Sequence, residues 1–492
     1  MENVATVRIM SSEIQQFKNI EFGEIKYMNY SSIQNNARIE NSDIVGLYGQ
    51  NGSGKTALVE ALDILKYILC CNEIPYNVYA GILPQKASSK ISTTFFVDLS
   101  ESKYKVLYEA IIRANQKTNK IELFQEKLIY WERGATWKNE KNIQFENIFY
   151  NVNDIIEDKT VEVKSNRLSI NNEIKFFNSM QSLAIFCSQA GISVFFNHLI
   201  SEKLSKLSDS KEAKILCNII RALTKFGNAD FHIIKVNQHG AINDNMLIPL
   251  NMRCETESSV VYGCLPMFIN GQIELPLEIY DLFSSIIEAI NIAIKSLIPN
   301  LQIDIEEKNK EKKTDGKDYI KLEIYSCRDN NRFLIKYESE GIKRIVSLLN
   351  YLISVYNSEN VCLVVDELDS GVFEYLLGEL LGMLYKEMKG QLIFTSHNLR
   401  ILEKLGSNNI ICSTTNPQNR YIRLKGIEKN HNKRDFYIRA ITVGGQKEEL
   451  YDEDDLLAMS YAFRKAGRKY KDSINIPFSD DFLKIKEEED KK

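Results

Sequence analysis

GQNGSGKT, residues 49–56, is the stretch of this 492-residue sequence that decides its fold. The apolar run Asp43–Tyr48 precedes it and indicates a buried strand, and Ala57–Leu69 follows with apolar residues at helical spacing. A strand, a glycine-rich turn and a helix in this order are the setting in which G-x-x-x-x-G-K-[ST] binds nucleotide phosphates. The sequence therefore predicts an α/β nucleotide-binding domain rather than a chance glycine turn.

The residue types in this turn match the chemistry of a triphosphate. Glycines let the backbone bend so that its N–H groups face phosphate oxygens, and the positive end of the following helix points at the anion. Lys55 would place a cation on the β- and γ-phosphates, and Thr56 would supply a hydroxyl to Mg²⁺. The residues expected to bind ATP here are Gly49, Asn51, Gly52, Gly54, Lys55 and Thr56.

VCLVVDE, residues 361–367, is an apolar strand that ends in two carboxylates. A pair of carboxylates at a buried strand end is costly unless it meets a cation or a hydrogen-bond network. We expect Asp366 to hold Mg²⁺, directly or through water, and Glu367 to orient and deprotonate the attacking water. The alternative, an ordinary helix start with acidic first-turn residues, is disfavoured by the phosphate-binding turn upstream.

Two weaker patterns flank this strand. LIFTSH, residues 392–397, is expected to be the next strand, and His397 at its end would reach the γ-phosphate, although a capping histidine is the alternative. SEGIKR, residues 339–344, begins a helix, for which Ser339 suits the N-cap while Gly341 permits close approach of the backbone to phosphate. A plain helix cap is the more common explanation of Ser-x-Gly; its place between the turn and the acidic strand favours a binding role.

The composition limits the class of protein. Apolar residues make up 44% and charged residues 26%, with a net charge of −4, so a globular chain without a general attraction for nucleic acid or anionic lipid is expected. Nine cysteines without metal spacing are expected to be reduced structural thiols. We recognise neither a signal peptide nor an 18-residue apolar stretch, and therefore expect a cytoplasmic protein without membrane contact.

Periodicity predicts the remaining elements. Val7–Met10 and Ile14–Ile20 alternate weakly, which indicates a strand hairpin or edge. A meander of strands is expected over Ser92–Leu99, Lys103–Ala114 and Lys120–Trp131, and helices are expected over Met180–Ile200, Lys211–Phe226 and Leu277–Leu297. KNKEKKTDGK, residues 308–317, is expected to be a charged loop at a hairpin tip. From residue 319 strands and helices alternate, which is typical of a mostly parallel sheet.

Taken in order, these motifs resemble the ABC ATPase heads of the SMC, RecF and OLD group. Residues 49–56 resemble the Walker A motif, 339–341 the signature motif and 361–367 Walker B, with Asp369 in the place of the D-loop and His397 in that of the switch histidine. FKNI, residues 17–20, is also similar to the first strands of that group. The resemblance covers roughly residues 1–130 and 319–410.

The resemblance implies a fold and a mechanism. The fold class is α/β: an ABC ATPase head, with a mixed sheet around the phosphate loop, an antiparallel β subdomain and a mainly helical insertion. The implied parts are an N-terminal lobe at 1–177, the insertion at 178–300, a C-terminal lobe at 301–425 and an extension at 426–492. Two heads would face each other, so that Ser339 and Gly341 of one complete the ATP and Mg²⁺ site of the other, and hydrolysis releases the clamp.

The sequence departs from the family pattern in two places. The signature is Ser-Glu-Gly rather than Leu-Ser-Gly-Gly, which puts the strength of the trans contact in doubt. No glutamine occupies an obvious Q-loop position, and Gln85 is a weak candidate. Sustained heptads, which SMC arms contain, are not recognisable in this sequence. The acidic strand pair of an OLD nuclease is not recognisable either, so we expect no nuclease activity of the chain's own.

YESEGIKRI (337–345) and QLIFTSHNLRILEKL (391–405) are most similar to stand-alone ATPases of prokaryotic anti-phage abortive-infection systems, such as the PARIS type. That resemblance implies a homo-oligomer built on head-to-head dimers that regulates a separately encoded effector, such as a nuclease toxin. The alternatives are a RecF- or SMC-like repair ATPase that clamps DNA, and a nucleotide-binding scaffold with negligible turnover. Basic and aromatic residues mixed with acidic ones over 434–470 leave contact with nucleic acid open.

Overall fold

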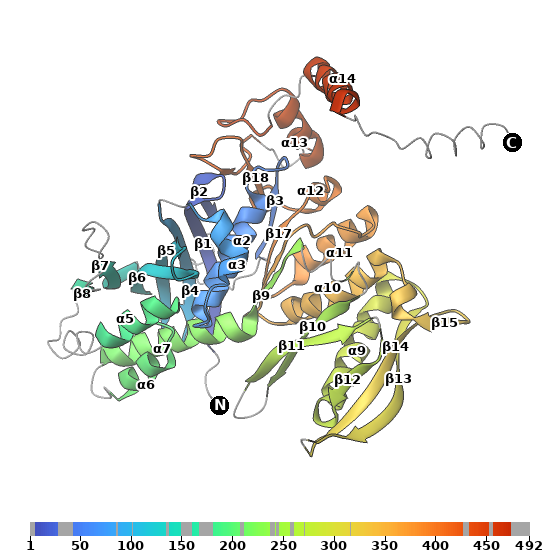
Figure 1. Cartoon of the computed structure of the whole chain (residues 1–492), viewed down its shortest axis with the longest axis horizontal. Coiled ribbons are helices and arrows are strands. Elements are labelled where there is room, and N and C mark those ends of the chain that lie inside the picture. Colours follow the sequence, from blue (N-terminus) through green and yellow to red (C-terminus); the bar gives the residue numbers. More distant parts are fainter. Residues whose placement is uncertain are drawn as a thin grey trace. The chain divides into compact units, whose positions relative to one another are not determined.

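A computed structural model of the chain (Figure 1) describes residues 5–27, 43–84, 87–100, 102–133, 137–148, 160–166, 181–206, 211–236, 242, 246–255, 260–269, 271–314, 316–426, 432–451 and 456–473. The chain divides into a unit of Met1–Leu450 and a unit of Tyr451–Lys492. Within the second unit the described element is helix α14 (Leu456–Ser473), on which the aromatic rings of Tyr461 and Phe463 are exposed.

A six-stranded mixed sheet carries the phosphate-binding turn. Its order is β19-β18-β3-β17-β16-β9, and neighbouring strands are parallel except β18 and β19. The strands are short and apolar because both faces of the sheet are covered. They span Asp43–Tyr48 (β3), Phe231–Ile234 (β9), Cys362–Val365 (β16), Gln391–Thr395 (β17), Ile410–Ser413 (β18) and Tyr421–Ile422 (β19).

A seven-stranded antiparallel sheet forms the β subdomain, in the order β2-β1-β4-β5-β6-β7-β8. Its strands span Thr6–Phe17 (β1), Ile20–Lys26 (β2), Ser89–Asp98 (β4), Lys103–Asn115 (β5), Lys120–Arg133 (β6), Trp137–Ile148 (β7) and Thr160–Asn166 (β8). The predicted meander is therefore confirmed. The hairpin expected over Val7–Met10 and Ile14–Ile20 is wrong in its position: both segments fall mainly in the single strand β1, because pairing with β4 runs along both of them with an irregularity between Ile9 and Ser11. The hairpin turn lies instead between Phe17 and Ile20, where β1 pairs with β2. Helix α2 (Lys55–Leu69), which follows the turn, buries its apolar face in the core that it shares with this sheet.

Helix α10 (Glu340–Asn357) lies between two further cores. One core joins it to α11 (Glu374–Glu387), α12 (Arg400–Lys404) and the outer face of the central sheet. The other joins it to α9 (Leu277–Leu297) and to antiparallel strands, namely Leu247–Glu255 (β10), Val260–Phe268 (β11), Ile273–Pro276 (β12), Leu301–Lys312 (β13), Asp318–Arg328 (β14) and Asn331–Leu334 (β15). Since α10 starts at the predicted signature residues, its packing decides where they point.

Two further predicted elements differ from the structure. The single helix expected over Met180–Ile200 is two helices, α5 (Gln181–Ala190) and α6 (His198–Ser205), because Gly191 turns the chain with φ 72°. A Cβ at this glycine would lie 2.7 Å from the carbonyl oxygen of Ile121, so no other residue fits. The next expected helix forms as α7 (Lys211–Lys225).

The charged segment 308–317 is not all loop. Strand β13 continues to Lys312 and β14 begins at Asp318, which leaves only a tight tip. Pairing across the strands explains this, since Lys321 lies 2.9 Å from Glu311 and Lys313 lies 2.7 Å from Glu274. The pattern of alternating charge signs thus supports a solvated hairpin.

The predicted fold class is confirmed: the chain is α/β, with a mixed sheet around the phosphate loop, an antiparallel β part and additional helices. Residues 178–300 contain helices α5, α6, α7 and α9 together with strands, and β9 from this segment pairs with β16 in the central sheet. The boundaries at 177, 300 and 425 stay predictions. No helix of the described residues is long and apolar enough to cross a membrane.

Candidate functional site

Residues from four separate segments meet in one open cleft of about 410 Å³. This volume suits a small organic ligand of nucleotide size. The cleft is lined by Lys18, Asn19, Asn51, Gly52, Gly54, Lys55, Thr56, Ala57, Asp366, Glu367, Thr395 and His397. The parallel order β3-β17-β16 explains the assembly, because the carboxyl ends of neighbouring parallel strands meet at one edge of the sheet. Segments more than 300 residues apart in the sequence therefore face one another.

The turn after β3 has a backbone that requires glycine. Gly49 has φ 152° and Gly52 has φ 78°, values that other residues rarely adopt. A Cβ at Gly49 would lie 1.9 Å from Oγ of Ser413 on β18, whereas one at Gly52 would project into open space. The first N–H groups of a helix have no acceptor within the helix, and the residues at the start of α2 line the cleft, so the turn is suited to bind an anion.

Lys55 folds back over this turn. Its Nζ donates to the carbonyl oxygens of Gly49 and Gln50, both at 2.8 Å. Burial lowers the pKa of Lys55, and the carboxylates at the end of β16 oppose that effect only in part. A cation that is partly stripped of water beside an open anion site would gain strongly from a phosphate.

Asp366 presents a buried oxygen that accepts no hydrogen bond from the described residues. The residue is 1% exposed, and its Oδ1 accepts a hydrogen bond from Oγ1 of Thr395 at 2.6 Å. Across the described part of the chain, no group donates to its Oδ2. Because a buried carboxylate oxygen normally finds a hydrogen bond or a cation, and Thr56 lines the same cleft, these two residues fit a Mg²⁺ ion.

Glu367 has a strained backbone at the end of the acidic strand. Its φ is 49°, in the left-handed region that costs about 1 kcal/mol or more for a residue with a side chain. The backbone N–H of Glu367 donates to Oγ1 of Thr395 at 2.8 Å, and this bond holds the turn. The half-buried carboxylate consequently lines the cleft instead of following the strand.

Thr395 is a site residue that the sequence reasoning missed. Its hydroxyl donates to Asp366 and accepts from the Glu367 backbone, so one side chain orients both predicted acidic residues. Its position within residues 392–397, next to the predicted His397, was the available signal. Buried polar groups normally have hydrogen-bond partners, and a hydroxyl at a neighbouring strand end is one such partner for a pair of acidic residues.

His397 lies at the exposed rim of the cleft, and its backbone N–H donates to the Asp369 carboxylate at 3.2 Å. Partial desolvation lowers the pKa of His397, the Lys55 cation lowers it further, and the nearby carboxylates oppose both. The imidazole is therefore neutral near pH 7, and its ring can donate or accept a hydrogen bond.

Ser339 and Gly341 lie outside this cleft. Ser339 caps α10, with its Oγ accepting from the Ile342 N–H at 3.4 Å, and its side chain is exposed. A Cβ at Gly341 would lie 2.4 Å from the carbonyl oxygen of Gly371, so glycine is needed where α10 meets the turn after Asp369. The structure therefore separates these two predicted residues from the cleft of their own chain.

The loop between β1 and β2 also reaches the cleft. Asn19 donates through Nδ2 to the Gly52 carbonyl, and Lys18 pairs with Glu60 of α2 at 2.5 Å. These residues belong to FKNI, which the sequence reasoning quoted without giving them a role. Gln85, the weak Q-loop candidate, lies outside the described residues.

SMC head domains are among the solved structures to which this chain is similar. An SMC head bound to the C-winged helix domain of ScpA matches with a TM-score of 0.41 and 11% identity, over 85% of this chain and 97% of that chain. The SMC head domain from Thermotoga maritima gives 0.32 and 12%, over 85% and 100%. A head with an extended coiled coil bound to the C-terminal domain of ScpA, from Pyrococcus furiosus, gives 0.36 and 12%, over 85% and 96%.

No family model matches this chain, and no curated protein matches its sequence. At these TM-scores the structural likeness carries no weight for function, which must come from the cleft itself.

Proposed function

We propose that this protein is an ABC-type ATPase that binds ATP with Mg²⁺ and hydrolyses it to ADP and phosphate. One observation carries the proposal: the buried, unpartnered Oδ2 of Asp366 shares a cleft with the glycine turn and with Thr56. An anion site and a cation site side by side are what a metal–triphosphate needs.

The residues divide the chemical work. The turn and Lys55 would hold the phosphates, while Thr56 and Asp366 would hold the Mg²⁺, which supplies charge neutralisation on the phosphate oxygens. Glu367 would accept a proton from the attacking water, and its strained backbone keeps the carboxylate turned into the cleft. His397 at the rim would hydrogen-bond the γ-phosphate as a neutral imidazole.

Completion of the site would need a second copy of the chain. Ser339 is exposed at the N-terminus of α10, a position where hydroxyl and N–H groups can bind an anion, yet it is absent from the lining of its own cleft. A head-to-head dimer would bring Ser339 and Gly341 of each subunit onto the triphosphate of the other. ATP would then act as a ligand that favours association, and hydrolysis would release it.

The role of this cycle is inferred from the motif resemblance. It supports an ATPase of anti-phage abortive-infection defence, such as the PARIS type, that oligomerises and holds or releases a separately encoded effector. The alternative is a RecF- or SMC-like ATPase that clamps DNA. Pull-down from the native host separates them: a co-encoded toxic partner supports defence, and ATP-dependent retention on duplex DNA supports repair.

Hydrolysis is tested with Glu367→Gln, which keeps the shape of the side chain and removes the base. We expect the turnover number for ATP to fall by about 10²- to 10³-fold, with ATP affinity retained. Glu379→Gln is the matched control, because Glu379 is an exposed glutamate of α11 that pairs with Lys404 at the surface. Unchanged turnover in Glu367→Gln would exclude this base and leave a nucleotide-binding scaffold.

A further inference from the structure

Arg344 is a buried arginine whose charged group has no hydrogen-bond partner among the residues that the structure describes. The side chain is 3% exposed, and within the described ranges nothing accepts a hydrogen bond from its Nε or from either terminal nitrogen. Arg8, buried to a similar extent, shows the usual arrangement, since it donates to the Asp43 carboxylate at 2.6 Å and to the Lys389 carbonyl. A buried cation without such bonds is unfavourable, so its retention needs a reason.

The place of Arg344 in the fold suggests that reason. It lies just over one helical turn beyond Ser339, on the same helix α10. Helix α10 packs against β16, the strand that leads to Asp366 and Glu367. Arg344 is therefore on the helix that begins next to the residue proposed to contact a second copy, and this helix packs against the strand that leads to the carboxylates proposed to act within its own cleft.

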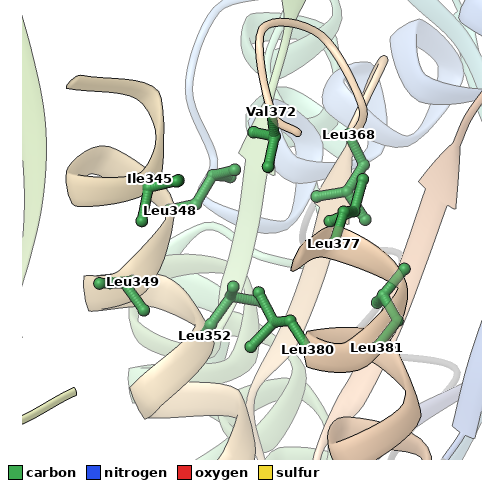
Figure 2. A pocket seen from close by; sticks show the side chains of 9 residues that line it. All are labelled: Ile345, Leu348, Leu349, Leu352, Leu368, Val372, Leu377, Leu380 and Leu381. Carbon is green, nitrogen blue, oxygen red and sulfur yellow. The ribbon is translucent and has the colours of Figure 1, made fainter. Parts of the chain in front are cut away.

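The contact between α10 and α11 beside Arg344 is apolar. Figure 2 shows a small apolar cavity between the two helices, with Ile345 and Leu348 on the side of α10 and Leu368 and Val372 facing them. Ile345 directly follows Arg344, and Leu368 directly follows Glu367. A shift of α10 relative to the strand end that carries Glu367 would therefore move apolar side chains past one another.

Charges in the cleft favour such a shift. Burial lowers the pKa of Arg344 to about 9, and Glu367 and then Asp366 are the groups that oppose this. The guanidinium and the two carboxylates thus attract one another without being joined by a hydrogen bond. A movement that brings the guanidinium of Arg344 onto the Glu367 carboxylate would give Arg344 a hydrogen-bond partner. It would also leave the free oxygen of Asp366 available for the metal.

We propose that Arg344 is a positioning residue that pairs with Glu367 when Ser339 on the same helix engages the nucleotide of a second copy. This inference rests on the proposed ATPase function. The pairing holds the Glu367 carboxylate, as its anion, toward the attacking water. When Ser339 of one subunit contacts the ATP bound by its partner, α10 shifts and positions Glu367 of the same subunit as Ser339. Hydrolysis therefore depends on the association of the two subunits.

The test uses Arg344→Met, Arg344→Lys and Arg344→Gln in the full chain. Because the charge is unpaired in the nucleotide-free protein, Arg344→Met should raise the melting temperature of that form while lowering the turnover number at least about tenfold with little change in KM. Arg344→Lys should recover part of the turnover. Arg8→Met is the matched control, and it should lower the melting temperature because Arg8 is paired.

A pH profile of turnover separates positioning from simple structural support. The guanidinium favours the anionic form of the base, so in Arg344→Gln the acid limb of the turnover profile should move to higher pH. Arg344→Lys should keep the wild-type limb, and Arg332→Gln, which removes a surface arginine, should leave both limb and rate unchanged.

Three results would overturn the inference while the ATPase proposal stands: a wild-type turnover number in Arg344→Gln, an unshifted acid limb with reduced turnover, or a lower melting temperature in Arg344→Met. Failure of the ATPase proposal would look different, since the wild-type chain itself would then show no turnover, or Glu367→Gln would retain it.

Discussion

The phosphate cleft and helix α10 hold the two halves of the proposed ATP site, and they differ in how complete they are within one chain. In the cleft, Thr395 joins Asp366 to the backbone of Glu367, and Lys55 is hydrogen-bonded to the turn. At α10, Ser339 caps the helix and is exposed to solvent, and the buried Arg344 has no hydrogen-bond partner among the described residues. The polar groups of the cleft are thus largely held by one another, whereas the guanidinium on α10 is not held by any described group.

The first prediction, with the largest expected effect, concerns Lys55, the cation of the cleft. Lys55→Ala should lower ATP affinity by at least about 100-fold, because a desolvated cation beside the phosphates contributes several kcal/mol. Titration calorimetry with ATP and Mg²⁺ measures it. Lys386→Ala, at an exposed position of α11, is the control and should bind like the wild type. Tight binding by Lys55→Ala would contradict the cleft as a phosphate site.

The second prediction tests whether Ser339 acts on the ATP site of its own chain or on the ATP site of a second copy. Ser339→Arg should keep the ATP affinity of the isolated chain and should lower turnover about 100-fold, because the blocked residue acts on the other subunit. Mixing Ser339→Arg with Lys55→Ala should restore part of the activity, since one site of the mixed dimer retains both halves. Steady-state ATPase assays over a range of mixing ratios measure this. A mixture no more active than its components would contradict a site shared between subunits.

The two regions also differ in how far the sequence predicted them. Residues 49–56 and residues 361–367 are each one continuous stretch of sequence. The conformation of each stretch is set by its own glycines or by its own strand end, so their position in the cleft followed from the local sequence pattern. Arg344 could not be found this way. In SEGIKRI it reads as an ordinary charge near a helix start, and only the packing of α10 against α9, β10 and β16 buries it.

Thr395 and Asn19 were missed for a related reason. Their hydrogen bonds reach residues 29 and 33 positions away, and they depend on the order of strands in the sheets. The sequence pattern indicates that strands exist but not which strand ends are neighbours. Similarly, the pairing of β9 with β16 is a parallel contact between strands more than 100 residues apart in the sequence.

A third prediction concerns the link inside the cleft. Thr395→Val keeps the shape of the side chain and leaves Asp366 and the Glu367 N–H without their shared partner. We expect about a tenfold loss of turnover and a loss of about 1–3 kcal/mol of stability in the absence of nucleotide. Denaturant unfolding and ATPase assays measure the two effects. Thr442→Val, on an exposed helix, is the control; if Thr395→Val behaves like it, the cleft is not preorganised through Thr395.

The smallest expected effect is the pH response of His397, which lies at the boundary between the two regions. Its folded-state pKa is below the usual value, because of partial desolvation and the Lys55 cation. The unfolded chain therefore takes up the proton first as pH falls, and the folded state loses stability as pH drops through about 6.5, with the loss complete below the folded pKa. Melting temperatures of the nucleotide-free protein between pH 7.5 and pH 5, as approximate limits, should show a shallower decline in His397→Gln than in the wild type. Equal slopes would mean that the histidine is not coupled to Lys55, and its place beside the phosphate site would then carry no electrostatic consequence.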